Sequence, residues 1–405
     1  MTTLALPLIA ARTLGASALE MGILAGAAQA PFLLFSLPAG AWVDRLPRRP
    51  VLVAADLAAA MLLVSIPGVA VFATPPYVQL CAVAFGIGTC TVISEVAHYA
   101  YVPTLVARSQ LTQSNSRLQI SHSASAAGGP GLAGVLIELL TAPFAVLVDA
   151  VSFLTSALLL RSIRKPEADV ELEGETVTLR QAIGDGLRRL LGHPLLRPIV
   201  LLTALSGFFE TGVLALYIVY ATRNLHLSPV LIGVIFAAGG IGAIPGAILA
   251  ERYGERFGVG RTIIFGFALS GFGALVLPLA AGPVAVVVAM LMLGKAFAGI
   301  TQTAGNIHQW TLRQTVTPDR FAGRVTAGHR FIVYGACAVG AFVGGAFGSA
   351  IGVRDALFVL AVGMLASPLI GVFSPLRNLR RQPADVDDER PAQPEREAHL
   401  VATTE

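Results

Sequence analysis

Charged residues are scarce in this chain of 405 residues: Asp, Glu, Lys and Arg make up 13% of it, against 55% hydrophobic residues. Soluble globular proteins carry roughly 25% charged residues. The mean hydropathy is +0.73, and the charges cluster between long apolar runs. The composition therefore argues against a soluble domain. A net charge of +4 does not call for a nucleic-acid partner.

Residues that build disulfides, metal sites and active sites are also few. The three cysteines, Cys81, Cys90 and Cys337, lie within apolar runs, which excludes a disulfide framework or a thiolate cluster. The seven histidines form no H-x-x-x-H pair, and neither a glycine-rich phosphate loop nor a serine-nucleophile elbow stands out. We therefore expect no metal, no cofactor and no enzyme activity.

Apolar runs of about 20 residues recur along the whole chain, and about 20 apolar residues in helical form cross a bilayer core of ~30 Å. The sequence thus predicts an all-α, multi-pass membrane protein with twelve spans. We place these spans at residues 1–15, 21–43, 51–73, 78–101, 115–139, 143–162, 198–221, 229–250, 261–280, 283–303, 322–350 and 355–374.

The spans predict two six-helix bundles, at 1–162 and 198–375, with a middle loop at 163–197 between them. In that loop Leu179, Ile183, Leu187 and Leu190 share one helical face, which favours an amphipathic helix on the inner membrane surface. A plain solvated linker is the alternative. Residues 376–405 are rich in proline, arginine and acids, and we expect a disordered tail.

Basic residues are distributed unevenly between the two sides of the predicted spans. Of the 28 lysines and arginines, 23 fall on the side of the middle loop and the tail, 3 on the other side and 2 within spans. Because cytoplasmic loops carry an excess of Lys and Arg, both termini are expected in the cytoplasm. The expected location is the plasma membrane.

An internal repeat relates the two bundles. A shift of 207 residues aligns "SEVA" at 94–97 with "TQTA" at 301–304, Arg117 with Arg324, and Pro38 with Pro245. Since each half holds an even number of spans, the copies insert with the same orientation. Parallel repeats of this kind are typical of transporters with a substrate path between the halves.

The stretch "GAWVDRLPRR" at 40–49 resembles the G-x-x-x-D-R-x-G-R-R loop of the major facilitator superfamily, which also lies between the second and third helices. The segments "LPAGAWVDRLPRRPVL", "GPGLAG" and "LVDAVSFLTSALL" look most like the sequences of one branch of this superfamily, which includes enterobactin and macrolide exporters. Pro47 departs from the glycine of that pattern, so the turn cannot copy a left-handed glycine conformation. The resemblance implies a monomer of two six-helix bundles that works by alternating access.

The charges of this loop are expected to close the cytoplasmic side. Asp44 ends the second helix, where the helix dipole disfavours a carboxylate, so it needs a partner. By the family's arrangement the start of the eleventh helix lies opposite Asp44, and Glu251 faces the start of the fifth; topological anchoring is the alternative. The predicted gate residues are Gly40, Asp44, Arg45, Arg48, Arg49, Arg117, Glu251, Arg252 and Arg324.

In the fifth span, Gly129, Pro130 and Gly134 resemble the Gly-Pro motif of antiporters in the same superfamily. Small residues allow close helix approach and proline bends a helix. Generic helix packing explains the motif equally well.

Ionisable residues at membrane depth are functional candidates. Glu210 lies about 12 residues into its span, roughly 18 Å deep, and is the first candidate for binding protons or a cationic substrate; a buried ion pair with Lys295 is the alternative. Glu95 and His98 form a second candidate proton path or are interfacial polar residues. Arg330 is expected to face the central cavity or pair with an acid, and Asp149 to be structural or functional at the outer start of its helix.

These features predict a secondary active transporter that exports a small, partly hydrophobic molecule in exchange for protons. A drug, a macrolide or a siderophore is the class that the resemblance implies. An importer of a polar nutrient is the alternative, although its cavity should be richer in Asn, Gln and Trp; a non-transporting membrane sensor is a third. The first span, at ~22 Å of helix, is shorter than the ~30 Å needed. We expect either that translation starts upstream of Met1 or that this version inserts poorly and works badly.

Overall fold

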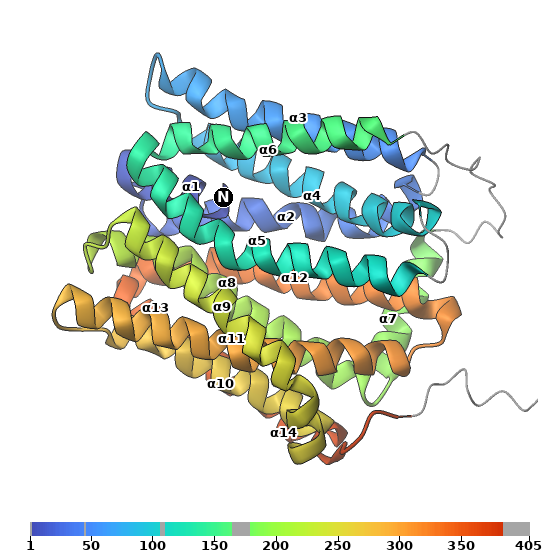
Figure 1. Ribbon diagram of the computed structural model, residues 1–405. Coiled ribbons are helices and arrows are strands. Elements are labelled where there is room, and N and C mark those ends of the chain that lie inside the picture. The colour runs from blue at the N-terminus through green and yellow to red at the C-terminus, as the bar shows by residue number, and fades with distance from the viewer. Residues whose placement is uncertain (1, 44–45, 106–109, 164–178, 384–405) are drawn as a thin grey trace, which may run out of the picture.

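The computed structural model describes residues 2–43, 46–105, 110–163 and 179–383, which are helical throughout apart from short connections and contain no strand (Figure 1). The helices are α1 (Thr2–Leu8), a π-helical turn (Ile9–Thr13), α2 (Ala18–Val43), α3 (Arg48–Ala70), α4 (Tyr77–Leu105), α5 (Leu111–Leu140), α6 (Ala142–Ser162), α7 (Leu179–Gly192), α8 (Leu196–Arg223), α9 (Pro229–Phe257), α10 (Val259–Leu279), α11 (Val284–Thr315), α12 (Asp319–Ile351), α13 (Val353–Ala366), α14 (Leu369–Val372) and a 3-10 helix (Pro375–Asn378).

The predicted all-α, multi-pass architecture is confirmed. Within the described ranges, 10 helical stretches are long and apolar enough to cross a membrane, and α5 contributes a shorter apolar stretch at Ala124–Leu140. The first predicted span corresponds to α1 and the π-helical turn that follows it. Each of the twelve predicted spans therefore has a helical counterpart.

Several helices continue past the apolar runs that predict them. Helix α9 extends to Phe257 and α11 to Thr315, where hydropathy places the ends of the spans at 250 and 303. A helix keeps its internal hydrogen bonds outside the bilayer, so hydropathy locates the membrane crossing but not the end of the helix. Gly258, at φ +92°, then provides the sharp turn into α10.

Helix packing follows the 207-residue repeat. In the first half α2 packs on α4, and α3 packs on α4 and α6. Their equivalents in the second half make the same contacts: α9 packs on α11, and α10 packs on α11 and α13. Between the halves, α2 packs on α12 and α5 packs on α9. The 207-residue shift takes α2 to α9 and α5 to α12, so it converts one of these contacts into the other. The halves are thus two copies of one arrangement.

Glycines allow both of these contacts between halves. A Cβ added to Gly22 of α2 would lie 2.8 Å from the Cα of Gly345 in α12, and one added to Gly134 of α5 would lie 3.1 Å from the Cα of Gly233 in α9. Backbones this close leave no room for a side chain. All four glycines lie toward the end of the bundle opposite α7, which we call the distal side.

The hydrophobic core is continuous on the distal side and divided on the α7 side. One large cluster joins both halves near the distal side and includes Leu8, Ile66, Leu80, Leu216 and Leu357. On the α7 side, separate clusters surround Leu52 and Tyr101 in the first half and Leu196 and Leu312 in the second. Among the described residues, the largest cluster that joins the halves is thus near the distal side, and a smaller one at mid-depth packs Phe32 of α2 against Tyr334 of α12.

Candidate functional site

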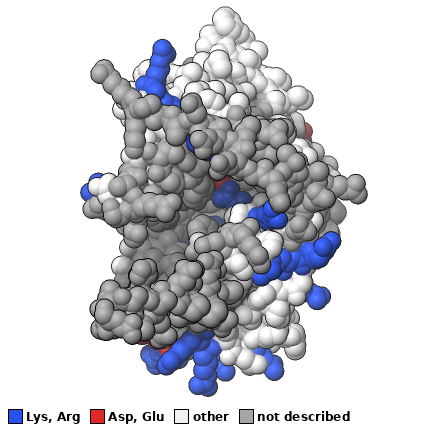
Figure 2. All heavy atoms as spheres, turned by 90° about the vertical axis from the view of Figure 1, so that its right-hand side faces the viewer, with Lys and Arg blue, Asp and Glu red and all other residues white. Residues whose placement is uncertain are grey.

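A hollow opens on the α7 side of the molecule. Figure 2 looks onto this end and shows the surface hollowed near its centre, with basic side chains in its wall. The hollow agrees with the divided core on this side. We take the walls of this hollow, where the two halves face each other, as the candidate site.

Polar contacts between the halves hold the distal side together. The Arg223 guanidinium, at the end of α8, donates to the carbonyl oxygens of Ala16, at 2.8 Å, and Ala11, at 3.3 Å. The backbone N–H of Leu19 in α2 donates to Ser349 Oγ in α12, at 3.0 Å. Within the described residues, these contacts close the distal side between the halves.

Glu210 lies at the middle of α8, the depth that its sequence position predicts, and is partly buried. Its carboxylate accepts a hydrogen bond from Gln302 of α11, with 2.8 Å between Gln302 Nε2 and Glu210 Oε2. A glutamine side chain both donates and accepts, so it can serve an ionised or a protonated carboxyl group. This pair is suited to holding and releasing a proton.

Lys295, also on α11, lies close enough to Glu210 for the two charges to attract each other. Its ammonium group lies over two aromatic rings, 4.9 Å from the ring centre of Tyr217 and 4.7 Å from that of Phe236. Aromatic faces stabilise a cation that has left water. The lysine is thus held by the rings, while Glu210 takes its hydrogen bond from Gln302.

Glu95 of α4 and Arg330 of α12 form an ion pair across the two halves, with 3.2 Å between Glu95 Oε2 and Arg330 Nη1. The side chains are 37% and 26% exposed, so the pair is in contact with water. His98, one turn along α4, is exposed. A water-accessible ion pair between two halves can break at small cost when they move.

The predicted gate residues are only partly described. Asp44 and Arg45 lie outside the described residues, and Gly40 lies in the last turns of α2. Arg117, Glu251 and Arg252 are exposed on the α7 side, and Arg48 begins α3. Arg49 donates to the carbonyl oxygens of Leu160, at 3.0 Å, and Arg161, so it connects α3 to the end of α6 within the first half.

The middle-loop helix forms as α7, and it packs on protein. The Arg189 guanidinium lies 4.7 Å from the centre of the Phe321 ring at the start of α12, and Arg324 lies 5.9 Å from the same ring. Leu190 is fully buried beside α8. The apolar side of α7 thus covers the first turns of α12 instead of resting on lipid alone.

His193, between α7 and α8, connects these two helices. Its Nδ1 accepts hydrogen bonds from the backbone N–H groups of Leu195, at 3.2 Å, and Leu196, at 3.4 Å, where α8 begins. An imidazole accepts at Nδ1 only in its neutral form. Burial and the nearby positive charge of Arg189 both lower the pKa of His193, which favours that form.

The remaining predicted residues lie away from the hollow or act in packing. Pro130 and Gly134 are part of the contact of α5 with α9, whereas the space around Gly129 is open. Asp149 of α6 accepts a hydrogen bond from the backbone N–H of Thr2, at 3.0 Å, which fixes α1 on α6.

Sequence reasoning missed several polar residues that the structure brings together. Gln302 is the repeat counterpart of Glu95 under the 207-residue shift, so the alignment of "SEVA" with "TQTA" held the signal that would have found it. A second group is buried among α8, α11 and α12: His329 Nε2 lies 3.3 Å from both Thr203 Oγ1 and Gln309 Nε2. Tyr217 and Phe236 escaped notice because aromatic residues in apolar helices are common in cores.

Comparison with known proteins identifies the family. Residues 6–402 match the model of the transmembrane secretion effectors, a family within the major facilitator superfamily. The match covers nearly the whole chain. This protein belongs to that family. It is therefore a membrane transporter of the major facilitator type, as the loop at 40–49 indicated.

Individual proteins that are similar to this transporter are membrane transporters as well. It is 28% identical to the multidrug efflux pump Tap of Mycolicibacterium fortuitum over 378 residues, which cover 90% of this chain and 89% of that one. Among solved structures, it is similar to a bacterial homologue of the iron transporter ferroportin in its inward-facing state (17% identity, TM-score 0.70, covering 92% of this chain and 94% of that one). It is also similar to the nucleoside transporter NupG (12% identity, TM-score 0.71, covering 92% and 96%). At these identities the structures establish the fold alone.

Proposed function

We propose that this transporter exports a small, partly hydrophobic molecule, such as a drug, a macrolide or a siderophore, in exchange for protons. The relative from M. fortuitum is a multidrug efflux pump. The branch that the loop sequence at 40–49 resembles includes exporters. The chain acts as a monomer in the plasma membrane. Its α7 side faces the cytoplasm, because that side carries the excess of arginine.

The observation that carries this proposal is the Glu210–Gln302 pair at mid-membrane depth. A carboxylate there is costly in energy and is retained where it serves transport. When Glu210 is ionised it accepts from the Gln302 amide; when it is protonated its O–H can donate to the Gln302 carbonyl oxygen. Proton binding therefore changes the charge of the cavity without leaving a polar group unsatisfied.

Movement of the halves is coupled to this site through the charges nearer the cytoplasm. A proton on Glu95 weakens its ion pair with Arg330 and so releases α4 from α12. Closing of the hollow then brings the end of α2, where Asp44 follows, toward Arg324 at the start of α12. In this scheme the gate residues form their contacts only after the cytoplasmic side has closed.

The test uses inside-out vesicles with an imposed acid interior and a panel of dyes, macrolides and siderophores. Glu210→Gln should reduce gradient-driven accumulation more than tenfold, because an amide cannot release a proton, while exchange of substrate for substrate continues. Glu255→Gln, at an exposed position near the end of α9, is the matched control and should behave as wild type. Unchanged gradient-driven flux in Glu210→Gln would reject the proton role.

Vesicles of both orientations separate export from the alternative of nutrient import. An importer of a polar nutrient would leave the apolar panel untouched and would concentrate sugars, nucleosides or amino acids in right-side-out vesicles with an acid exterior. Accumulation of a panel compound only in inside-out vesicles supports export.

A further inference from the structure

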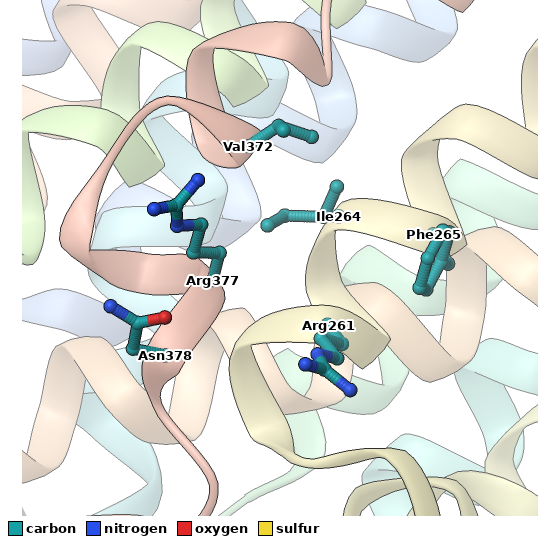
Figure 3. A pocket seen from close by; sticks show the side chains of 6 residues that line it. All are labelled: Arg261, Ile264, Phe265, Val372, Arg377 and Asn378. Carbon is teal, nitrogen blue, oxygen red and sulfur yellow. The ribbon is translucent and has the colours of Figure 1, made fainter.

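A pocket of ≈ 410 Å³ lies on the α7 side, between the start of α10 and the chain that follows α14. Figure 3 shows its side chains, which come from the start of α10, the end of α14 and the 3-10 helix Pro375–Asn378. They are Arg261, Ile264, Phe265, Val372, Arg377 and Asn378. The pocket is separate from the hollow between the halves, because all of these residues belong to the second half.

The pocket exists because the chain after α14 packs back onto α10. Leu376 is fully buried, and the carbonyl oxygens of Leu379 and Arg380 accept from the N–H groups of Gly260, at 2.9 Å, and Val259, at 3.2 Å. The first N–H groups of a helix have no partner within the helix, so these contacts satisfy α10 at its start. The prediction of a disordered tail from residue 376 is therefore wrong for this packed segment, and residues 384–405 lie outside the described residues.

The polar half of the pocket is basic. Arg261 and Arg377 each contribute a guanidinium and Asn378 an amide, and the six lining residues include no carboxylate. The acids nearby, Glu251 and Glu255, line a neighbouring pocket, which Arg261 also lines. Guanidinium groups with an amide donor match the oxygens of a phosphate.

The apolar half of the pocket lies deeper in the membrane. Arg261 is in the first turn of α10, a membrane-spanning helix that begins at Val259, and Arg377 follows the last span, which ends at Val372. Both arginines are therefore at headgroup depth. Phe265, 54% exposed, lies one turn further in. A free phosphate would use only the basic half, whereas a phospholipid fills both.

We propose that this pocket binds an anionic phospholipid, with its phosphate between Arg261 and Arg377 and an acyl chain along Phe265 and Val372. The lipid would bridge the start of α10 and the packed segment after α14. It would thereby stabilise the contact that satisfies the first N–H groups of α10.

Native mass spectrometry of the purified full-length protein tests this proposal by counting phosphatidylglycerol and phosphatidylcholine retained from equal mixtures. Wild type should prefer phosphatidylglycerol. The double variant Arg261→Gln/Arg377→Gln should bind it about 25-fold more weakly, since each arginine near a membrane surface contributes about fivefold. Arg261→Lys/Arg377→Lys, which keeps both charges, should retain the preference. If the double Gln variant aggregates, either single Gln variant should bind phosphatidylglycerol about fivefold more weakly than wild type.

The matched control is Arg161→Gln/Arg256→Gln, which removes two exposed arginines from helix ends on the same side but outside the pocket. It should retain the wild-type preference. Equal retention of the two lipids by wild type, or an equal loss in the control, would overturn the proposal. Displacement of the lipid by soluble glycerol 3-phosphate would also overturn it, because the site would then belong to a small phosphate.

Discussion

A neutral partner suits a mid-membrane carboxylate that has to change its charge. If Lys295 were the ion-pair partner of Glu210, each protonation would leave a buried ammonium without its counterion, which is costly. The structure instead gives Glu210 the Gln302 amide and places the lysine over Tyr217 and Phe236. These cation–π contacts are made with the rings and not with the carboxylate, so protonation of Glu210 does not remove them.

His193 gives the protein a pH-dependent contact outside the membrane. The pKa of His193 is lowered, so the neutral ring that caps α8 is favoured in the folded protein. The stabilisation of the folded protein by this neutral ring is fully present above the ordinary histidine pKa of ~6.5. It is lost as the pH falls from there through the lowered pKa of His193 in the folded protein.

We therefore expect His193→Ala to destabilise the purified protein at pH 7.5 by about 1 kcal/mol, the usual contribution of a helix cap. The difference from wild type should shrink as the pH falls below ~6.5, because histidine in the unfolded chain then binds a proton that the folded ring disfavours. Thermal unfolding followed by circular dichroism across this pH range measures it. A gap that stays constant with pH would show that the ring contributes through packing alone.

The sequence predicted the charged residues of the candidate site, but neither how they pair nor the role of His193. Glu210, Glu95 and Arg330 stood out because charge is rare at membrane depth. The pairing of Glu95 with Arg330 joins α4 to α12, and no sequence pattern specifies which helices of the two halves face each other. His193 gave no signal, since its role depends on the angle between α7 and α8.

Among the helices, α5 and α9 depend on each other through glycine. A Cβ on Gly233 would lie 2.5 Å from the carbonyl oxygen of Pro130, and one on Gly134 would lie 2.6 Å from that of Pro229. Hydropathy placed both helices correctly, but the second glycine of the contact lies in the other half of the chain. The Gly-Pro motif therefore predicted a close approach without naming the partner helix.

Gly134→Leu should push α5 from α9 and destabilise the protein by about 1–3 kcal/mol, as overpacking does. Gly129→Ala, in the same motif but with open space around it, is the control and should be neutral or stabilising by up to about 1 kcal/mol, because alanine favours helix. Thermal unfolding in one detergent compares the two. Equal destabilisation by both variants would mean that the motif acts through helix flexibility and not through contact.

For the whole molecule, the described residues place the largest cluster between the halves on the distal side and a hollow on the α7 side (Figure 2). The large core and the contacts of Arg223 and Ser349 join the halves on the distal side, while the α7 side is hollow (Figure 2). Alternating access requires the distal contacts to separate in the other state. The repeat could predict two equivalent halves, but not which side would be open, because both states satisfy the same sequence.

A disulfide across the distal side tests this requirement. A Cβ on Gly348 of α12 would lie 2.9 Å from the Cβ of Ala18 in α2, and a disulfide needs about 3.5–4.5 Å, so a shift of roughly 1 Å lets the two cysteines bond. In a variant whose three native cysteines are replaced, we expect Ala18→Cys/Gly348→Cys to cross-link on oxidation and to lose transport more than tenfold.

Substrate binding from the α7 side should survive in the cross-linked protein, because the hollow does not depend on opening of the distal side, and a reducing agent should restore transport. Each single-cysteine variant, treated with the same oxidant, is the control and should transport at its untreated rate. Cross-linked protein that still transports at the unlinked rate would mean that α2 and α12 stay together throughout the cycle. The halves would then have to move about that contact instead of separating there.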